Sequence, residues 1–167
     1  MPVPALAARV HALLADRGHT LAVAESLTGG MIGAALTAVP GASAVFRGGA
    51  VTYATDTKAA LLDVPAALLA DHGAVHPDVA TAMARGARRL FTATYGLAVT
   101  GVAGPDPQDG QPVGTVYAAA ARPDNRCDLR KLQLHGDREA IREQTVAAAL
   151  ALLRDTLAAD VAQTTVK

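Results

Sequence analysis

The sequence predicts one α/β domain over residues 1–167, with three α/β/α layers and a mixed, partly parallel sheet. Between residues 20 and 100, short apolar runs alternate with helical patterns, which is typical of parallel strands joined by helical crossovers. Two later apolar runs flank a Pro-Asp-Asn turn, which indicates an antiparallel hairpin. The length suits a single domain, and the sequence shows no internal repeat or linker.

Each element follows from a local pattern. Leucines and valines at helical spacing predict the first helix, which Gly18 ends. Asp56 or Thr57 is expected to cap a short helix, and Pro77 to open a long one. The predicted helices cover residues 4–16, 30–38, 56–62, 65–72, 77–94 and 138–158, and the predicted strands cover residues 20–24, 46–53, 95–100, 113–121 and 129–135. Residues 160–167 are expected to form a frayed tail.

Charge and composition exclude several classes of protein. Lys plus Arg equals Asp plus Glu at 15 each, so neither nucleic acid nor an anionic membrane surface is an expected partner. The single cysteine, Cys127, cannot form a disulfide within the chain. The histidines lack metal-ligand spacing, so no metal or other cofactor is expected. Charged residues interrupt the apolar stretch before residue 19, and glycines and prolines interrupt the uncharged stretch 26–46. These interruptions argue against a signal peptide and against a transmembrane helix, and a cytoplasmic protein is therefore expected.

Three predicted strands end in segments rich in hydroxyl groups and glycine, namely residues 25–30, 53–58 and 100–105. Ligands of open α/β sheets bind at the carboxyl ends of strands, so these segments are expected to meet at one edge. Ser26 sits where a strand-to-helix turn exposes a hydroxyl beside unpaired N–H groups, which suits a nucleophile with an oxyanion site near Thr28–Gly30. The alternative is that Ser26 or Thr28 is an ordinary helix cap.

Lys58 is the candidate base, because no histidine follows a strand at a comparable turn. To act as a base near neutral pH, its pKa must fall about three units from the usual value of about 10.4. The alternative is a solvated lysine at a helix start. Gly101 and Gly104 could bring the backbone close to a ligand or merely shape a tight connection. Arg138, at the start of the last helix, is a candidate phosphate ligand or a plain surface residue.

Taken together in order, these segments resemble the C-terminal domain of the competence/damage-inducible protein CinA, from about residue 5 to residue 158. The motifs that carry the resemblance are AESLTGG at 24–30, GAVTY at 49–53 with Lys58, HGAV at 72–75, GVAGP at 101–105, PVGTV at 112–116 and GDR at 136–138. Stand-alone members are nicotinamide-nucleotide amidases. The resemblance therefore implies conversion of nicotinamide mononucleotide and water to nicotinate mononucleotide and ammonia, by a homo-oligomer without a cofactor.

The resemblance also implies a serine–lysine mechanism at Ser26 and Lys58. Tyr53 and Thr100 are candidates to orient these two groups. Residues expected to contact the substrate are Glu25, Thr28, Gly29, Gly30, Gly101, Gly104 and Arg138. The chain departs from the family where Leu27 replaces a common cysteine, Ala54-Thr55 replaces Ser-Asn, and His76 replaces a serine at a helix start.

Two other classes of function remain open. The chain could be a pyridine-nucleotide-binding module without turnover, which the altered Ala54-Thr55 pair favours, or an interaction domain derived from a CinA protein.

Overall fold

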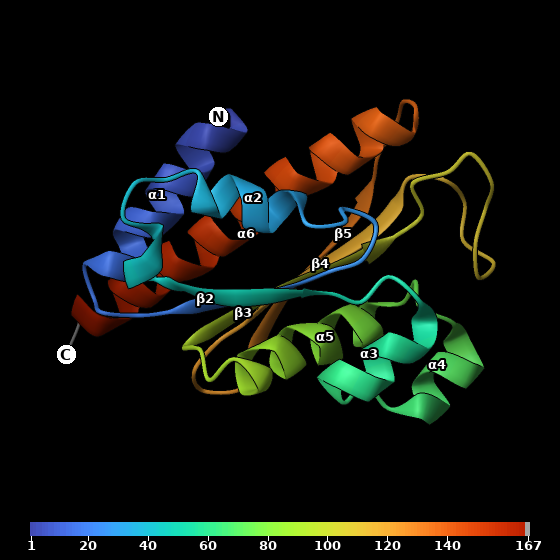
Figure 1. Ribbon diagram of the computed structural model, residues 1–167, viewed down its shortest axis with the longest axis horizontal. Coiled ribbons are helices and arrows are strands. Elements are labelled where there is room, and N and C mark those ends of the chain that lie inside the picture. The colour runs from blue at the N-terminus through green and yellow to red at the C-terminus, as the bar shows by residue number, and fades with distance from the viewer. Residues whose placement is uncertain (166–167) are drawn as a thin grey trace.

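A computed structural model describes residues 1–165, with side chains through residue 162, and contains a single sheet of five strands in the order β2-β1-β3-β4-β5 (Figure 1). Strand β1 runs parallel to both β2 and β3, whereas β4 runs antiparallel to β3 and β5. The predicted mixed, partly parallel sheet is therefore confirmed. The strands are β1 (Leu21–Glu25), β2 (Phe46–Val51), β3 (Tyr95–Gly101), β4 (Thr115–Ala121) and β5 (Cys127–Gln133).

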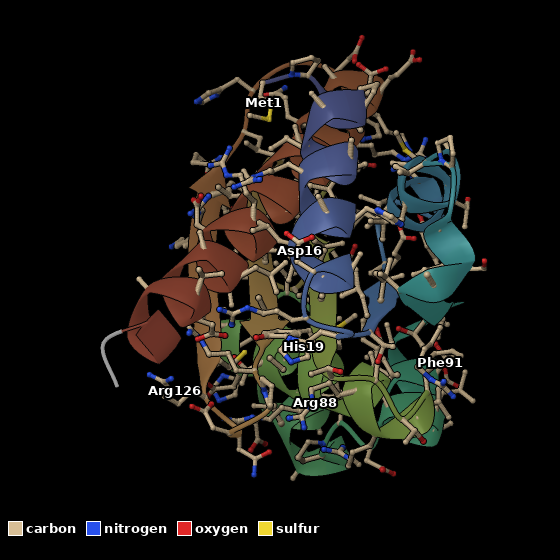
Figure 2. The ribbon with its side chains drawn as sticks, turned by 90° about the vertical axis from the view of Figure 1, so that its left-hand side faces the viewer. Met1, Asp16, His19, Arg88, Phe91 and Arg126 are labelled. Atoms are coloured by element: carbon tan, nitrogen blue, oxygen red, sulfur yellow. The ribbon has the colours of Figure 1, made fainter. Side chains whose placement is uncertain are left out.

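Helices cover both faces of the sheet, which confirms the three-layer prediction (Figure 1). On one face lie α1 (Val3–Ala15), α2 (Met31–Thr37) and α6 (Arg138–Thr165), with α1 packed along α6 (Figure 2). On the other face lie α3 (Thr55–Leu62), α4 (Ala66–His72) and α5 (Pro77–Leu90). A single turn of 3-10 helix, Ala42–Ala44, precedes β2. No helix within residues 1–165 is both long enough and apolar enough to cross a membrane.

Small residues bring α5 close to its neighbours. Successive residues of a strand point to opposite faces, so Leu21 and Val23 of β1 pack in the core beneath α1 and α6, while Ala22 packs toward α5. At Gly96 of β3, an added Cβ would lie 2.0 Å from the carbonyl oxygen of Ala84 on α5. Only glycine permits this approach. Such close packing fits a core that contains few aromatic side chains.

The predicted elements all exist, and most of their ends lie within two residues of the prediction. Three differences concern a helix cap or a larger shift. Helix α5 ends at Leu90 instead of residue 94, because Thr92 takes a left-handed conformation with φ of 51°. Neither Asp56 nor Thr57 caps α3. The N-cap is Ala54, which has no side-chain cap, and the Thr57 hydroxyl donates to the Ala54 carbonyl at 2.6 Å.

The third difference concerns the predicted frayed tail, of which residues 166–167 lie outside the described residues. Helix α6 continues to Thr165, beyond the expected end at residue 158. Asp160 anchors this last part of the helix, because its carboxylate accepts hydrogen bonds from the buried Tyr95 hydroxyl, at 2.7 Å, and from Arg122. Long-range partners of this kind leave no periodic signal in the sequence.

Candidate active site

Three parallel strands end side by side and bring the predicted segments together. Glu25 of β1 pairs with Val51 of β2, and Ala24 pairs with Ala98 of β3. Ser26 therefore follows β1 at the same edge where Tyr53 follows β2. This edge is the place where open α/β sheets bind ligands.

Ser26 and Lys58 meet in the protein interior, 32 residues apart in sequence. The Lys58 Nζ lies 3.1 Å from the Ser26 Oγ, and Lys58 is fully buried while Ser26 is 8% exposed. Lys58 lies in the first turn of α3. The Lys58 Nζ donates to the Thr52 carbonyl oxygen at 2.6 Å and to the Tyr53 carbonyl oxygen at 3.4 Å. The backbone that follows β2 thus fixes the amino group against the serine.

Burial also changes the basicity of this amino group. Desolvation lowers the pKa of Lys58 from 10.5 to about 8, against the opposing effect of the Asp109 charge. An appreciable fraction of Lys58 is therefore uncharged near neutral pH. A lysine in this state can take a proton from a hydroxyl within hydrogen-bonding distance.

A cavity of about 110 Å³ opens beside Ser26. Its volume is below the 300–1,000 Å³ or so of typical small-molecule pockets, so a nucleotide-sized molecule would not fit inside it completely. The lining residues are Ser26, Leu27, Tyr53, Ala74, Val75, Thr100, Gly101, Val102, Ala103, Gly104, Asp106, Gln108 and Arg138.

Three predicted residues shape this cavity. The Thr100 hydroxyl donates to the Ala74 carbonyl at 2.8 Å and so ties β3 to the segment before α5. Arg138, in the first turn of α6, donates to the Tyr53 hydroxyl at 2.9 Å and to the Gly104 carbonyl at 2.7 Å. Both Tyr53 and Arg138 are exposed, so this bridge forms the rim of the cavity.

Glu25 and Thr28, which were predicted to contact the substrate, do not line the cavity. Glu25 is 2% exposed and caps α2, because its carboxylate accepts from the Ile32 N–H at 2.9 Å and the Gly33 N–H at 3.0 Å. The buried Thr28 hydroxyl donates to the same carboxylate at 2.7 Å. The side chains of both residues therefore stabilise the turn.

Gly29 and Gly30 also shape the turn and do not line the cavity. The Gly29 N–H donates to the Ser26 carbonyl at 3.1 Å, and Gly30 has a left-handed φ of 104° just before α2. An oxyanion site at the start of α2 was expected because helix N-termini leave N–H groups unpaired. Glu25 satisfies the N–H groups of Ile32 and Gly33, so these two groups of α2 are not available to an oxyanion.

Arg142 and Asp109 carry contacts that the sequence did not reveal. Arg142 of α6 donates through Nε to the Leu27 carbonyl at 2.9 Å and through Nη2 to the Thr28 carbonyl at 3.3 Å. The Asp109 carboxylate, from the loop that follows β3, accepts from the Ala74 N–H at 2.9 Å. Residues far apart in sequence form both contacts, so no local motif indicates them.

Two features of the surroundings complete the site. His76 acts as a helix cap, because its Nδ1 accepts from the Asp78 N–H at 3.2 Å. Within the described part of the chain, no three His, Cys, Asp or Glu side chains gather into a group able to hold a metal ion.

Comparison with known proteins gives consistent results. Residues 4–157 match the family model described as the CinA C-terminal domain. A CinA-like protein of Frankia casuarinae is 55% identical over 146 residues, which is 87% of this chain and 34% of that protein. A CinA-like protein of Geobacter sulfurreducens is 51% identical over 146 residues, covering 87% of this chain and 35% of that one. The chain thus spans about a third of the length of these relatives.

Solved structures agree in fold along nearly their whole length. A CinA superfamily protein of Klebsiella pneumoniae superposes with a TM-score of 0.90 at 36% identity, covering 95% of this chain and 99% of that one. The competence/damage-inducible protein CihA of Agrobacterium tumefaciens gives a TM-score of 0.88 at 36% identity, covering 93% and 94%. Since the matched segment takes in the site as well as the sheet, the chain belongs to the CinA C-terminal domain family.

Proposed function

We propose that this chain is an amidase that hydrolyses the carboxamide of nicotinamide mononucleotide to nicotinate mononucleotide and ammonia. The observation that carries the reaction class is the 3.1 Å contact between the Ser26 Oγ and the buried Lys58 Nζ, whose pKa burial lowers to about 8. The choice of nucleotide rests on the family resemblance.

In the proposed reaction, uncharged Lys58 takes the Ser26 hydroxyl proton while the Oγ attacks the carboxamide carbon. The protonated Lys58 then passes this proton to the departing nitrogen, and ammonia leaves as the C–N bond breaks. Water hydrolyses the resulting acyl ester, with Lys58 again as the base. During the charged intervals, the Thr52 and Tyr53 carbonyls accept hydrogen bonds from the ammonium group.

The cavity supports an amide-first orientation of the substrate. At about 110 Å³ it has room for the carboxamide end, while the rest of the nucleotide lies toward the exposed rim. Arg138 at that rim is the proposed phosphate ligand, because guanidinium groups bind phosphate oxygens through paired hydrogen bonds. The proposal includes a homo-oligomer, as the resemblance implies, and a cytoplasmic location.

Ammonia release from nicotinamide mononucleotide by the purified chain tests the proposal. Ser26→Ala should lower kcat by at least about a thousandfold, since it removes the nucleophile. Lys58→Met should lower it by about 10²- to 10⁴-fold, which is the usual contribution of a general base. Matched controls are Ser43→Ala and Lys131→Met, which change exposed residues outside the cavity and should leave turnover unchanged.

Three results would contradict the proposal in different ways. Turnover retained by Ser26→Ala would overturn the nucleophile assignment. Nucleotide binding without ammonia release by the unaltered chain would indicate a binding module instead. Neither binding nor release would point to an interaction domain.

A further inference from the structure

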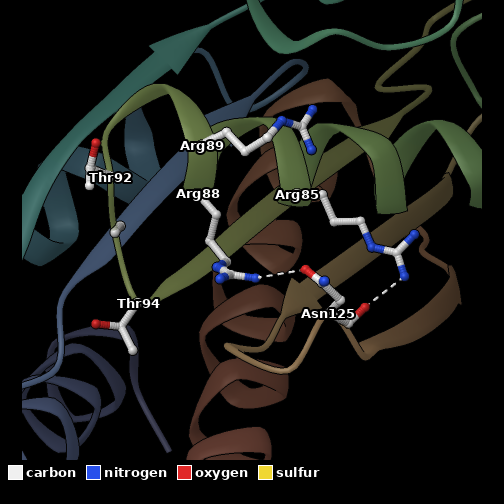
Figure 3. A pocket seen from close by; sticks show the side chains of 7 residues that line it. Arg85, Arg88, Arg89, Thr92, Thr94 and Asn125 are labelled. Carbon is white, nitrogen blue, oxygen red and sulfur yellow. Dashed lines mark hydrogen bonds between the residues drawn. The ribbon is translucent and has the colours of Figure 1, made fainter.

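We propose that a second pocket, at the opposite ends of the strands from Ser26, binds a small phosphate-bearing anion. This pocket has a volume of about 380 Å³ and lies where α5 ends and β3 begins (Figure 3). Figure 2 views the molecule from this end, with Arg88 and Arg126 labelled. The lining residues are Arg85, Arg88, Arg89, Thr92, Ala93, Thr94 and Asn125.

Positive charge dominates the lining, which contains three arginines and no carboxylate. Arg85, Arg88 and Arg89 fall at helical spacing in the last turns of α5, where like charges repel one another. Among described residues, the only carboxylate within 4.0 Å of these three guanidinium groups belongs to Asp63, which lies 3.7 Å from Arg89 with both side chains largely exposed.

Neighbouring acidic residues are already committed to other arginines. Arg122 is paired with Asp128, at 2.5 Å, and with Asp160. Arg126 is paired with Asp124 at 2.6 Å. No carboxylate in the described part of the chain therefore offsets the charge of Arg85 and Arg88 by direct contact, and an anion in the pocket would do so.

The guanidinium groups are held in place before any ligand arrives. Arg85 donates to the Asn125 carbonyl at 2.8 Å, and Arg88 donates to the Arg122 carbonyl at 2.6 Å and the Pro123 carbonyl at 3.4 Å (Figure 3 shows the side chains converging). Each guanidinium has five N–H donors, so donors remain. The Arg88 Nε is buried and has no partner among the described residues.

Two residues of the lining have unusual backbone conformations. Thr92 and Asn125 take left-handed φ values of 51° and 67°. The left-handed region is unfavourable for β-branched Thr92, and such strain is concentrated at ligand-binding and catalytic sites. The negative end of the α5 dipole accounts for arginines in its last turn, but it does not account for the left-handed conformation of Thr92 beside the pocket.

The ligand class follows from the charge and the shape. The planar guanidinium group of arginine donates paired hydrogen bonds that fit phosphate oxygens. The pocket volume of about 380 Å³ lies within the range of small-molecule pockets. The basic residues form one compact hollow and not an extended stripe, and the chain has no net charge. These features favour a phosphate or pyrophosphate group of a small molecule over a nucleic acid backbone.

Calorimetric titration with pyrophosphate and with inorganic phosphate tests the proposal at a fixed ionic strength of about 0.1 M, which screens non-specific charge effects. Pyrophosphate should bind saturably, and amide NMR signals of residues 92–94 and 125 should move. Arg85→Gln and Arg89→Gln should each weaken binding roughly tenfold, because each removes charged hydrogen-bond donors. Both residues are exposed, and circular dichroism checks that the variants fold.

Two control variants locate the binding. Arg9→Gln removes one exposed charge from α1 and should not change pyrophosphate affinity. Arg138→Gln removes the proposed phosphate ligand at the rim of the Ser26 cavity, so it distinguishes binding at that cavity from binding at the arginine-lined pocket. The proposal is overturned by an absence of saturable binding, by affinity that only Arg138→Gln reduces, or by equal losses in Arg9→Gln and Arg85→Gln. Preferential binding of an oligonucleotide through the same arginines would overturn the small-molecule assignment. None of these results depends on amidase activity.

Discussion

Lys58 carries its amino group into an interior where charge is disfavoured, and this sets the pH dependence of the proposed reaction. The base must be uncharged, and burial lowers its pKa to about 8. Below that pH, kcat/KM should rise about tenfold per pH unit, and it should level off above it. A solvated lysine would instead give a rise that continues to pH 10.5 or so. The measurement is kcat/KM for nicotinamide mononucleotide between pH 6 and 10.

Asp109 provides an internal check on this assignment. Its negative charge raises the pKa of Lys58, so Asp109→Asn should move the rising limb of kcat/KM to lower pH. Asn keeps an oxygen that can accept from the Ala74 N–H, so the loop contact is retained. A limb that does not move, or moves upward, would contradict the assignment of Lys58 as the titrating group.

Glu25 stabilises the turn that presents Ser26, and this gives a prediction about folding stability. In Glu25→Gln an amide NH2 replaces one of the two oxygens that accept from Ile32 and Gly33, leaving a buried donor facing another donor. We expect a loss of about 1–3 kcal/mol in the free energy of unfolding, measured by urea denaturation. Glu143→Gln, at an exposed position of α6, is the control. Equal stability of the two variants would contradict the capping role.

At the scale of elements, the sequence predicts what depends on periodicity and turn chemistry. The short apolar run before Gly101 and the proline at Pro77 correctly located β3 and the start of α5, because adjacent residues dictate these features. The position of Ser26 beside Lys58 could be expected only from the common edge of parallel strands and the family resemblance. The role of Glu25 was missed because an acidic residue beside a candidate nucleophile suggests substrate contact as readily as capping.

Contacts between distant elements were beyond prediction, and Arg142 shows why they matter. This residue joins α6 to the Ser26 turn across 115 residues of sequence, through the Leu27 carbonyl. In Arg142→Gln the turn loses its two-point support, and kcat should fall about tenfold while the melting temperature changes little, because a small displacement of a nucleophile slows attack strongly. The control is Arg154→Gln on the same helix, whose hydrogen bonds within the described residues go only to its neighbour Asp155. An unchanged kcat in Arg142→Gln would contradict the positioning role.

At the scale of the whole molecule, the two ends of the parallel strands carry different functional groups. The carboxyl ends of β1, β2 and β3 carry the proposed chemistry, and the opposite end carries buried ion pairs and the arginine-lined pocket. Helix α6 spans both, since Arg138 lies at the rim of the active-site cavity and Asp160 bonds to Tyr95 at the start of β3. Stability and catalysis should therefore be separable by substitutions at the two ends of one helix.

Asp160→Ala tests this separation. It leaves the Arg122 side chain, which is 8% exposed, with one carboxylate instead of two, and it removes the acceptor of the buried Tyr95 hydroxyl. The free energy of unfolding should fall by about 2–4 kcal/mol, because breaking one side of a buried ionic network strands the remaining groups. Asp155→Ala, which breaks partly exposed pairs one turn earlier on α6, should change it by no more than about 1 kcal/mol. Because Asp160 is remote from Ser26, kcat of the folded variant should match that of the unaltered chain. A large loss of kcat without a loss of stability would show that the two ends are coupled through α6.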